Sequence, residues 1–209
     1  RFFEERIKEL NLFVTGVGNV GEKFLAQINQ QKKYIKENLK LKIRVIGVSN
    51  SRQMFFDENG IDLSNWKELL KNGEKAGIDT YFSRVSELNL RNSIFIDITA
   101  NQNVSEMYEP YLRQNIAVVT CNKIACASSS ENYNTLKNVS RKSNVSFLYE
   151  TNVGAGLPII DTLKNLIASG DRVHKIQAVL SGSLNFVFNK FDASTTFSSV
   201  VKQAATEGY

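Results

Sequence analysis

Apolar runs alternate with amphipathic stretches along the chain as far as residue 149. Five short, apolar runs rich in β-branched residues predict buried strands, over residues 10–15, 41–49, 93–99, 116–120 and 145–149. Apolar residues at helical spacing predict helices between them, over residues 22–34, 104–114 and 129–142, and a shorter helix around Trp66, Leu69 and Leu70. Strands that alternate with helices indicate a parallel sheet with helices on both faces.

The two ends of the chain follow other patterns. Phe3, Ile7 and Leu10 lie at helical spacing, which predicts a short amphipathic helix over residues 1–9. Because a protein rarely begins with arginine, we expect this helix to be a linker from an upstream domain. After Glu150 the chain is predicted to form a glycine-bearing loop, a strand at 172–180, and helices at 158–168, 184–191 and 197–206. We expect one domain over residues 10–149 and part of a second over residues 150–209.

Composition places the chain among soluble globular proteins. Of its 209 residues 42% are hydrophobic and 22% charged, no apolar run approaches the roughly 18 residues that span a bilayer, and no basic-then-apolar leader opens it. The two cysteines, Cys121 and Cys126, form neither a CxxC pair nor a disulfide framework, so we expect a cytoplasmic protein. The net charge is +5, but no basic stripe is interleaved with aromatic residues, so the pattern does not favour nucleic-acid binding.

A glycine-rich turn gives the strongest local signal. The segment FVTGVGNVG runs from a predicted strand into a predicted helix and places Gly16, Gly18 and Gly21 in the spacing GxGxxG. In a dinucleotide-binding βα unit the first glycine permits the tight turn, the second lets the pyrophosphate approach the backbone, and the third lets the helix pack against the strand. The N–H groups of the helix N-terminus then face the phosphates. A tight turn without a ligand is the alternative, since the motif by itself is weak evidence.

The end of the second predicted strand indicates which dinucleotide is preferred. NAD-binding domains usually place an acid there to hold the ribose 2′-OH, whereas this chain has Ser49, Asn50, Ser51 and Arg52. Ser51 and Arg52 can receive a 2′-phosphate, because a guanidinium matches phosphate geometry. The sequence therefore favours NADP(H), with NAD(H) as an alternative. The alternative is that Arg52 is an ordinary exposed arginine in a loop.

Two further predicted strands end in polar residues that should face the same crevice, because ligands of doubly wound sheets bind outside the carboxyl ends of the strands. Thr99, Ala100 and Asn101 lie at the end of the first strand, and Lys123 follows the second. A lysine there can stabilise negative charge that develops on a carbonyl oxygen, although a surface lysine gives the same pattern. Asp97 fits a strand-end acid bonded to backbone N–H groups as well as it fits a catalytic group.

Few residues suit metal binding or nucleophilic catalysis. The single histidine, His174, lies inside the predicted strand at 172–180 without a plausible triad partner, and we interpret it as structural. One histidine and two cysteines form no zinc constellation. Glu150 precedes a loop whose carbonyl groups can bind a cation.

Taken in order, several segments resemble the homoserine dehydrogenase family. They cover nearly the whole chain, and they read FVTGVGNVG, IDITANQ, VVTCNKIACAS, YETNVGAGLPIIDTL, LSGSLNFVFNKF and ATEGY. The segment GVSNSRQMFFDENGIDLSNWKELL resembles the bifunctional members, in which an aspartate kinase lies upstream. The resemblance implies a Rossmann-type doubly wound domain followed by the start of an α+β catalytic and dimerisation domain. It also implies NAD(P)H-dependent reduction of L-aspartate 4-semialdehyde to L-homoserine, on the route to threonine and methionine.

The family's site residues can be carried over where the motifs match. The resemblance implies that the pyrophosphate binds the glycine turn, at Gly16, Val17, Gly18, Asn19, Val20 and Gly21. It implies that Thr99, Ala100 and Asn101 lie by the ribose and nicotinamide, and that Lys123 lies near the nicotinamide and the substrate. Gly182, Ser183 and Tyr209 match the substrate side. A monovalent cation such as Na⁺ would bind, mostly through backbone carbonyls, at Glu150, Val153, Ala155 and Leu157.

The chain departs from the family in three places. Cys121 stands where the family has proline, and Ile124 where it often has a second lysine. The family also continues after Gly208 and Tyr209 with a segment that supplies substrate-binding acids and the main catalytic lysine. We therefore expect these 209 residues alone to bind cofactor but to turn over poorly, and we expect the full protein to dimerise through its second domain.

Two alternative functions remain open at the level of the sequence. A non-catalytic regulatory module that binds NADP(H) would use the same glycine turn. Another Rossmann oxidoreductase of the semialdehyde pathway, such as aspartate-semialdehyde dehydrogenase, needs a nucleophilic cysteine in its second domain. Both cysteines of this chain lie instead just after the predicted strand at 116–120.

Overall fold

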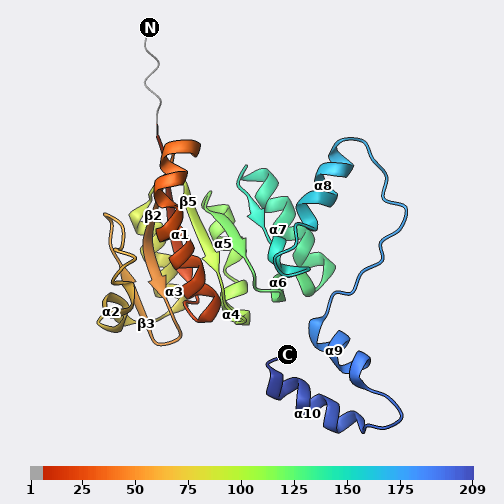
Figure 1. The fold of residues 1–209 in the computed structure, drawn as a ribbon. Coiled ribbons are helices and arrows are strands. Elements are labelled where there is room, and N and C mark those ends of the chain that lie inside the picture. The colour runs from red at the N-terminus through yellow and green to blue at the C-terminus, as the bar shows by residue number, and fades with distance from the viewer. Residues whose placement is uncertain (1–6) are drawn as a thin grey trace. The chain divides into compact units, whose positions relative to one another are not determined.

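The computed structural model describes residues 7–209, which divide into two compact units, the first ending at Asn152 and the second beginning at Val153. The first unit is a seven-stranded sheet with helices on both faces (Figure 1). Its strands are β1 (Lys8–Thr15), β2 (Leu41–Ser49), β3 (Gln53–Phe56), β4 (Glu74–Lys75), β5 (Ser93–Asp97), β6 (Ala117–Thr120) and β7 (Phe147–Leu148). Its helices are α1 (Asn19–Leu39), α2 (Trp66–Lys71), α3 (Ile78–Leu88), α4 (Gln102–Ser105), α5 (Tyr108–Arg113), α6 (Ile124–Ala127), α7 (Ser130–Lys142) and the 3-10 turn η1 (Glu150–Asn152).

The sheet has the strand order β4-β3-β2-β1-β5-β6-β7. Strands β2, β1, β5, β6 and β7 are parallel, as the alternation of strands and helices predicts. Strands β3 and β4 pair antiparallel at one edge, so the sheet is mixed rather than wholly parallel. The chain runs outward from β1 to β2 and then crosses back to β5. The strand order therefore reverses between β1 and β5, and ligand crevices of doubly wound folds lie at this switch point.

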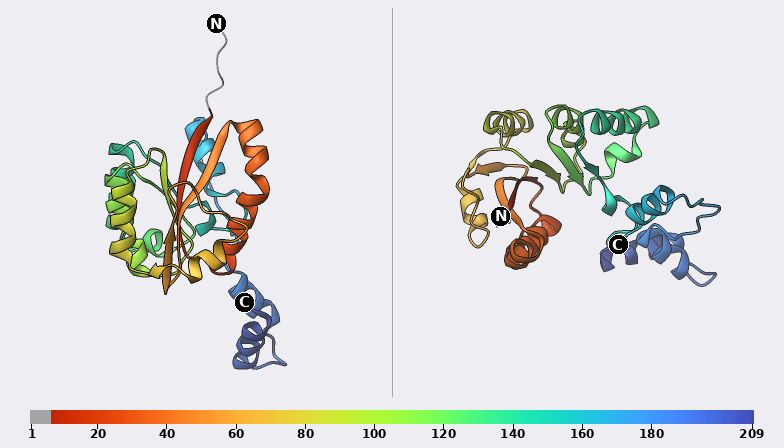
Figure 2. Two further views of the ribbon diagram at one scale, coloured as in Figure 1. Left: turned by 90° about the vertical axis from the view of Figure 1, so that its left-hand side faces the viewer. Right: turned by 90° about the horizontal axis from the view of Figure 1, so that it is seen from above.

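Alternate residues of the strands pack into two separate layers. Leu12 and Val14 of β1 belong to an apolar cluster that includes Leu25 of α1 and Trp66 of α2. Phe13 points to the opposite face, where aromatic rings follow one another beneath α3, α5 and α7: Phe56, Tyr81, Phe95, Tyr111, Tyr108 and Phe147. Figure 2 shows α1 on one side of the sheet and α3, α5 and α7 on the other. This two-residue alternation is the expected result of the strand pleat.

Several elements differ from the sequence prediction. Residues 1–6 of the helix predicted over 1–9 lie outside the described part, and Lys8 and Glu9 belong to β1, where Glu9 forms an ion pair with Lys42 of β2. The helix predicted over 104–114 is two short helices, α4 and α5, separated at Glu106 and Met107. Helix α3 was not predicted, although Ile78, Tyr81 and Val85 show helical spacing.

The second unit contains three helices, α8 (Ile160–Ala168), α9 (Gly182–Lys190) and α10 (Phe197–Glu207). Val187 of α9 packs against Val200 and Ala204 of α10 in a small apolar core. Gly208 ends α10 in the left-handed conformation, with φ +86°, as expected for a C-cap glycine.

The strand predicted over 172–180 does not form. These residues are exposed and make no strand pairing with any described residue. A strand needs a neighbour for its N–H and C=O groups, and this segment has none in the described residues. His174 therefore lies in an exposed, non-strand segment. Among residues 7–209 no helix is long and apolar enough to cross a bilayer.

Candidate functional site

The glycine turn joins β1 to α1 at the switch point of the sheet. Gly16 has φ +96°, and a Cβ atom at this position would lie 2.5 Å from the carbonyl oxygen of Ile98, the residue that follows β5. A Cβ atom at position 21 would lie 2.2 Å from the carbonyl oxygen of Gly16. Both contacts are shorter than side chains tolerate, so the protein's own packing requires glycine at these two positions.

Gly18, the middle glycine of the motif, has a different environment. A Cβ atom at Gly18 would meet no protein atom within 4 Å. Gly18 is the N-cap of α1, and no side chain caps the helix there. The first intrahelical bond of α1 runs from the N–H of Glu22 to the carbonyl oxygen of Gly18, so the N–H groups of Asn19, Val20 and Gly21 have no partner within the helix. A 21-residue helix that begins uncapped beside an open glycine fits an anionic group such as a pyrophosphate.

The turn after β2 is shaped by Asn50. Its Oδ1 accepts the backbone N–H groups of Arg52 and Gln53, each at 2.7 Å. Ser49 Oγ, at the last residue of β2, donates to Thr15 Oγ1 at 3.1 Å and so joins the ends of β1 and β2. Ser51 and Arg52 are exposed at the tip of this turn. Within the described part of the chain the Arg52 guanidinium has no ion pair or hydrogen bond, so its charge is available to a ligand.

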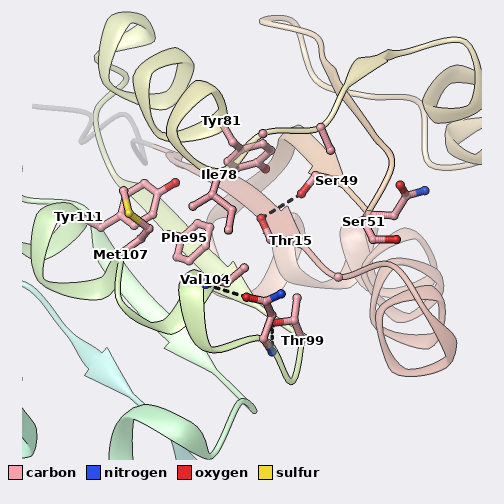
Figure 3. A pocket seen from close by; sticks show the side chains of 15 residues that line it. Thr15, Ser49, Ser51, Ile78, Tyr81, Phe95, Thr99, Val104, Met107 and Tyr111 are labelled. Atoms are coloured by element: carbon pink, nitrogen blue, oxygen red, sulfur yellow. Dashed lines mark hydrogen bonds between the residues drawn. The ribbon is translucent and has the colours of Figure 1, made fainter.

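A pocket of about 280 Å³ lies at the carboxyl edge of the sheet, beside the glycine turn. Four of the predicted site residues, Gly16, Ser51, Thr99 and Asn101, line it. The remaining lining residues are Thr15, Ser49, Asn50, Ala76, Gly77, Ile78, Tyr81, Phe95, Val104, Met107 and Tyr111. Figure 3 shows that the pocket runs from Met107 and Tyr111 at one end to Ser51 at the other. One end is therefore apolar and aromatic, and the other is polar and includes Ser51, the residue before Arg52.

Sequence analysis missed the residues that α3 and the segment before it contribute to this pocket. Ala76, Gly77 and Ile78 lie on the connection from β4 into α3, and Tyr81 lies on the first turns of that helix. The helical spacing of apolar residues in α3 is a sequence signal that could have predicted this helix. The sequence does not show that α3 lies beside the glycine turn, because this position depends on the sheet pairing of β3 and β4.

The ends of β5 and β6 are held together by a buried carboxylate. Asp97 is fully buried, and its Oδ1 accepts the backbone N–H of Thr99 at 2.8 Å. Its Oδ2 accepts the Tyr108 hydroxyl at 2.5 Å and Asn122 Nδ2 at 3.0 Å. Three hydrogen bonds offset the cost of burying the charge. Asp97 is thus a structural acid of the strand end, bonded to side chains as well as to a backbone N–H.

Thr99, Ala100 and Asn101 form the loop after β5. Thr99 Oγ1 accepts the N–H of Asn101 at 3.1 Å, and Asn101 Oδ1 accepts the N–H of Val104 and so caps α4. Ala100 is exposed and does not line the pocket. This loop therefore has a defined conformation before any ligand binds.

Lys123 follows β6 and lies one residue before α6. It is exposed, it does not line the pocket, and within the described chain it has no ion pair. Cys121, two residues earlier, is half-buried. Burial and the Asp97 carboxylate raise the pKa of the Cys121 thiol, while Lys123 acts against them. The structure places the lysine at the carboxyl edge of the sheet without assigning it a partner.

A buried acceptor lies on the other side of Asn122. Asn152 Nδ2 donates to the carbonyl oxygen of Asn122 at 3.3 Å. Asn152 Oδ1 is the one buried side-chain nitrogen or oxygen of the described residues that has no hydrogen-bond partner. Such an atom can accept a hydrogen bond from a ligand or a water.

The residues predicted for substrate and cation lie mostly in the second unit. Gly182 and Ser183 begin α9, which is capped by Ser181 Oγ, and the Tyr209 ring stacks on Phe186 at 4.5 Å. Three of the predicted cation ligands, Val153, Ala155 and Leu157, lie in a loop of the second unit, where Ala155 has φ +51°. Glu150 belongs to the first unit. Among the residues described, no cluster of three His, Cys, Asp or Glu side chains suits a metal ion.

Comparison with known families identifies what kind of domain surrounds this pocket. The family model described as the NAD-binding domain of homoserine dehydrogenase matches residues 16–150, and a second model, described as homoserine dehydrogenase, matches residues 158–209. The chain belongs to the homoserine dehydrogenase family. The first match begins at Gly16 and includes the whole carboxyl edge of the sheet, so the predicted Rossmann-type α/β fold is confirmed.

Individual members of the family are similar to most of this chain. The chloroplastic bifunctional aspartokinase/homoserine dehydrogenase 1 of Arabidopsis thaliana is 38% identical over all of the chain, which spans 23% of that protein. The homoserine dehydrogenase of Schizosaccharomyces pombe is 32% identical over 96% of the chain and 55% of its own length. A hyperthermophilic archaeal homoserine dehydrogenase solved with NADPH has the same fold, with a TM-score of 0.80 at 24% identity over 96% of this chain and 61% of its own. The chain thus spans only part of the relatives it matches.

Proposed function

We propose that the first unit binds NADP(H), with the pyrophosphate at the glycine turn. The observation behind this is the contrast among the three glycines: Gly16 and Gly21 are closed off by protein atoms, whereas Gly18 is open. A turn that served only to connect strand and helix would have no reason to keep the space beside Gly18 free. The uncapped N-terminus of α1 supplies N–H donors and a partial positive charge at the same place.

The adenosine half of the cofactor fits the pocket beside the turn. The apolar end, formed by side chains such as Ile78, Val104 and Met107, suits an adenine ring, and the polar end suits the ribose. No acid stands at the end of β2 to hold a free 2′-OH. Arg52 would instead face a 2′-phosphate, which favours NADP(H) over NAD(H). The archaeal relative, solved with NADPH, supports this choice.

In the complete protein we propose reduction of L-aspartate 4-semialdehyde to L-homoserine. The bound nicotinamide would supply the hydride. The chain's own contribution is position and charge: Lys123 lies at the end of β6 and would stabilise negative charge on the reacting oxygen. Gly182, Ser183 and Tyr209 are proposed to lie on the substrate side. Glu150, Val153, Ala155 and Leu157 are proposed to hold a monovalent cation, and the second unit to form a dimer contact.

The names of the relatives bear on one further part of the proposal, a fused kinase domain. Homologues such as the Arabidopsis protein are bifunctional with aspartokinase, so we propose an upstream kinase domain in the complete protein. The S. pombe relative is a homoserine dehydrogenase whose name includes no kinase.

An assay of homoserine oxidation in the complete protein tests this function. The wild type should reduce NADP⁺ in the presence of L-homoserine, and Lys123→Ala should lower kcat by about tenfold or more, because stabilisation of developing charge is removed. The control is Lys142→Ala, which removes an exposed lysine from the last turn of α7. An unchanged rate in Lys123→Ala would remove this residue from the mechanism, and no oxidation by the wild type would refute the activity.

A further inference from the structure

A buried tyrosine hydroxyl bridges the two strand ends that precede Thr99 and Lys123. Tyr108, on α5, is fully buried, and its hydroxyl lies 2.5 Å from Asp97 Oδ2 and 2.7 Å from Thr120 Oγ1. Asp97 is the last residue of β5, and Thr120 is the last residue of β6. These two residues are paired neighbours in the sheet. One side chain from the helical layer therefore contacts both strand ends at the edge where ligands bind.

The donors in this cluster follow from its chemistry. A carboxylate only accepts, so the Tyr108 O–H donates to Asp97. The tyrosine has no second hydrogen, so Thr120 donates to the Tyr108 oxygen. The Thr120 hydroxyl has a second possible acceptor, the backbone carbonyl oxygen of Asp97. This oxygen lies 3.3 Å from Thr120 Oγ1, farther than the Tyr108 oxygen at 2.7 Å. Thr120 Oγ1 in turn accepts the backbone N–H of Asn122 at 2.8 Å. The result is a directed chain from Asn122 N–H through Thr120 and Tyr108 to the carboxylate, in which each bond polarises the next.

The same carboxylate orders both loops on the ligand side. Its Oδ1 accepts the N–H of Thr99, and its Oδ2 accepts Asn122 Nδ2. Asn122 Nδ2 also donates to the carbonyl oxygen of Asn101 at 3.0 Å. Asn122 Oδ1 accepts the N–H of Ile124, so the amide orientation is set on both sides. The loop after β5 and the loop after β6 thus depend on one carboxylate, and Tyr108 holds that carboxylate.

We propose that Tyr108 is a positioning residue for the nicotinamide half of the cofactor. Its hydroxyl keeps Asp97 in the orientation that orders Thr99 to Asn101 on one side and Asn122 with Lys123 on the other. This inference rests on the proposed cofactor site, because only a dinucleotide that starts at the glycine turn would reach both loops. The turn that would receive the 2′-phosphate is built separately, by Asn50 at the end of β2.

Two ligands separate this role from a merely structural one. NADPH contains both halves of the cofactor, whereas adenosine 2′,5′-bisphosphate contains only the adenosine half. In Tyr108→Phe the ring remains and the hydroxyl is lost, so both loops lose order while the turn after β2 does not. The bisphosphate would meet only the loop after β5, whose Thr99 and Asn101 line the pocket, whereas NADPH would also reach Asn122 and Lys123 in the loop after β6. Titration calorimetry on the 209-residue chain should show about tenfold weaker binding of NADPH, and a change within about twofold for the bisphosphate. General destabilisation of the fold would weaken the binding of both ligands alike, and would leave the ratio of their two affinities unchanged.

The matched control is Tyr133→Phe, which removes a tyrosine hydroxyl bonded to Tyr149 at 2.7 Å, between α7 and the residue that follows β7. It should leave both affinities unchanged. If Tyr108→Phe does not fold, Thr120→Val removes the next hydroxyl of the chain and should give the same selective loss. An unchanged ratio of the two affinities in the folded variant would overturn the proposal. If the wild type binds neither ligand, the cofactor site itself is refuted, which is a different result.

Discussion

Gly21 on the first turn of α1 lies against the backbone of Gly16, so close that a Cβ atom on Gly21 would stand 2.2 Å from the Gly16 carbonyl oxygen. This contact brings the start of the helix onto the end of β1. It leaves Gly18 between them as the one glycine of the motif whose missing side chain opens space to the outside. The motif therefore contains two positions required by packing and one that only a ligand would require.

Alanine substitutions should separate these two requirements. Gly21→Ala should lower the free energy of unfolding by about 1–3 kcal/mol, because the added methyl group overlaps a backbone atom that cannot move aside. Gly18→Ala should leave stability nearly unchanged but weaken NADPH binding, because its methyl group occupies the space proposed for the pyrophosphate. Urea unfolding and NADPH titration on both variants measure the two effects. Equal loss of stability in both would contradict this division.

Cofactor preference should depend on Arg52. Its guanidinium is exposed and has no described partner, so Arg52→Ala should change stability little. It should weaken NADPH binding by about tenfold, the contribution of a hydrogen bond to a charged group, and leave NADH binding unchanged. Arg141→Ala, on the exposed face of α7, is the control. If the affinities for NADPH and NADH fall together, Arg52 does not contact the 2′-phosphate.

The Cys121 thiol should react slowly near neutral pH. Burial and the Asp97 carboxylate raise its pKa, so less thiolate is present at a given pH, and only the thiolate is alkylated. In a Cys126→Ala background, iodoacetamide labelling followed by mass spectrometry should accelerate only above the pH range of an ordinary thiol. Lys123 lowers this pKa, so Lys123→Ala should slow labelling further, whereas Lys142→Ala should not.

The buried tyrosines should make the fold sensitive to alkali. Burial raises the pKa of Tyr108 above its ordinary value of 10.0, and the Asp97 charge adds to this rise. A raised pKa in the folded state means that stability is complete below the unfolded value, near 10, and declines above it as the unfolded tyrosine ionises. Urea unfolding between pH 8 and pH 11 should show this decline, and Tyr108→Phe should make it shallower. An equally steep decline in that variant would show that Tyr108 makes no contribution.

The parts of this structure that are local in sequence were predictable. The parallel strands and the glycine turn follow from apolar runs and a motif that lies between two of them. The antiparallel strands β3 and β4 were not predicted, because Gln53–Phe56 and Glu74–Lys75 are too short to give a pattern and are stabilised by pairing with β2 and with each other. The segment at 172–180 has the composition of a strand, but no partner strand for it lies among the described residues.

The site was predictable to the same extent. Gly16, Ser51, Thr99 and Asn101 were chosen from strand ends, and they line one pocket. Tyr108 was not singled out, because its importance depends on contacts with Asp97 and Thr120, which come from two different strands. A tyrosine on an amphipathic helix gives no sign in the sequence that its hydroxyl is buried against a carboxylate.

The central claim is that the carboxyl edge of this sheet binds NADP(H) at the glycine turn. It is tested most directly by titrating the 209-residue chain with NADPH and with NADH and following the fluorescence of the reduced nicotinamide. The account predicts saturable, one-to-one binding, tighter for NADPH than for NADH and weakened by Gly18→Ala. Absence of saturable binding up to about 1 mM nucleotide, or binding that Gly18→Ala does not affect, would contradict it.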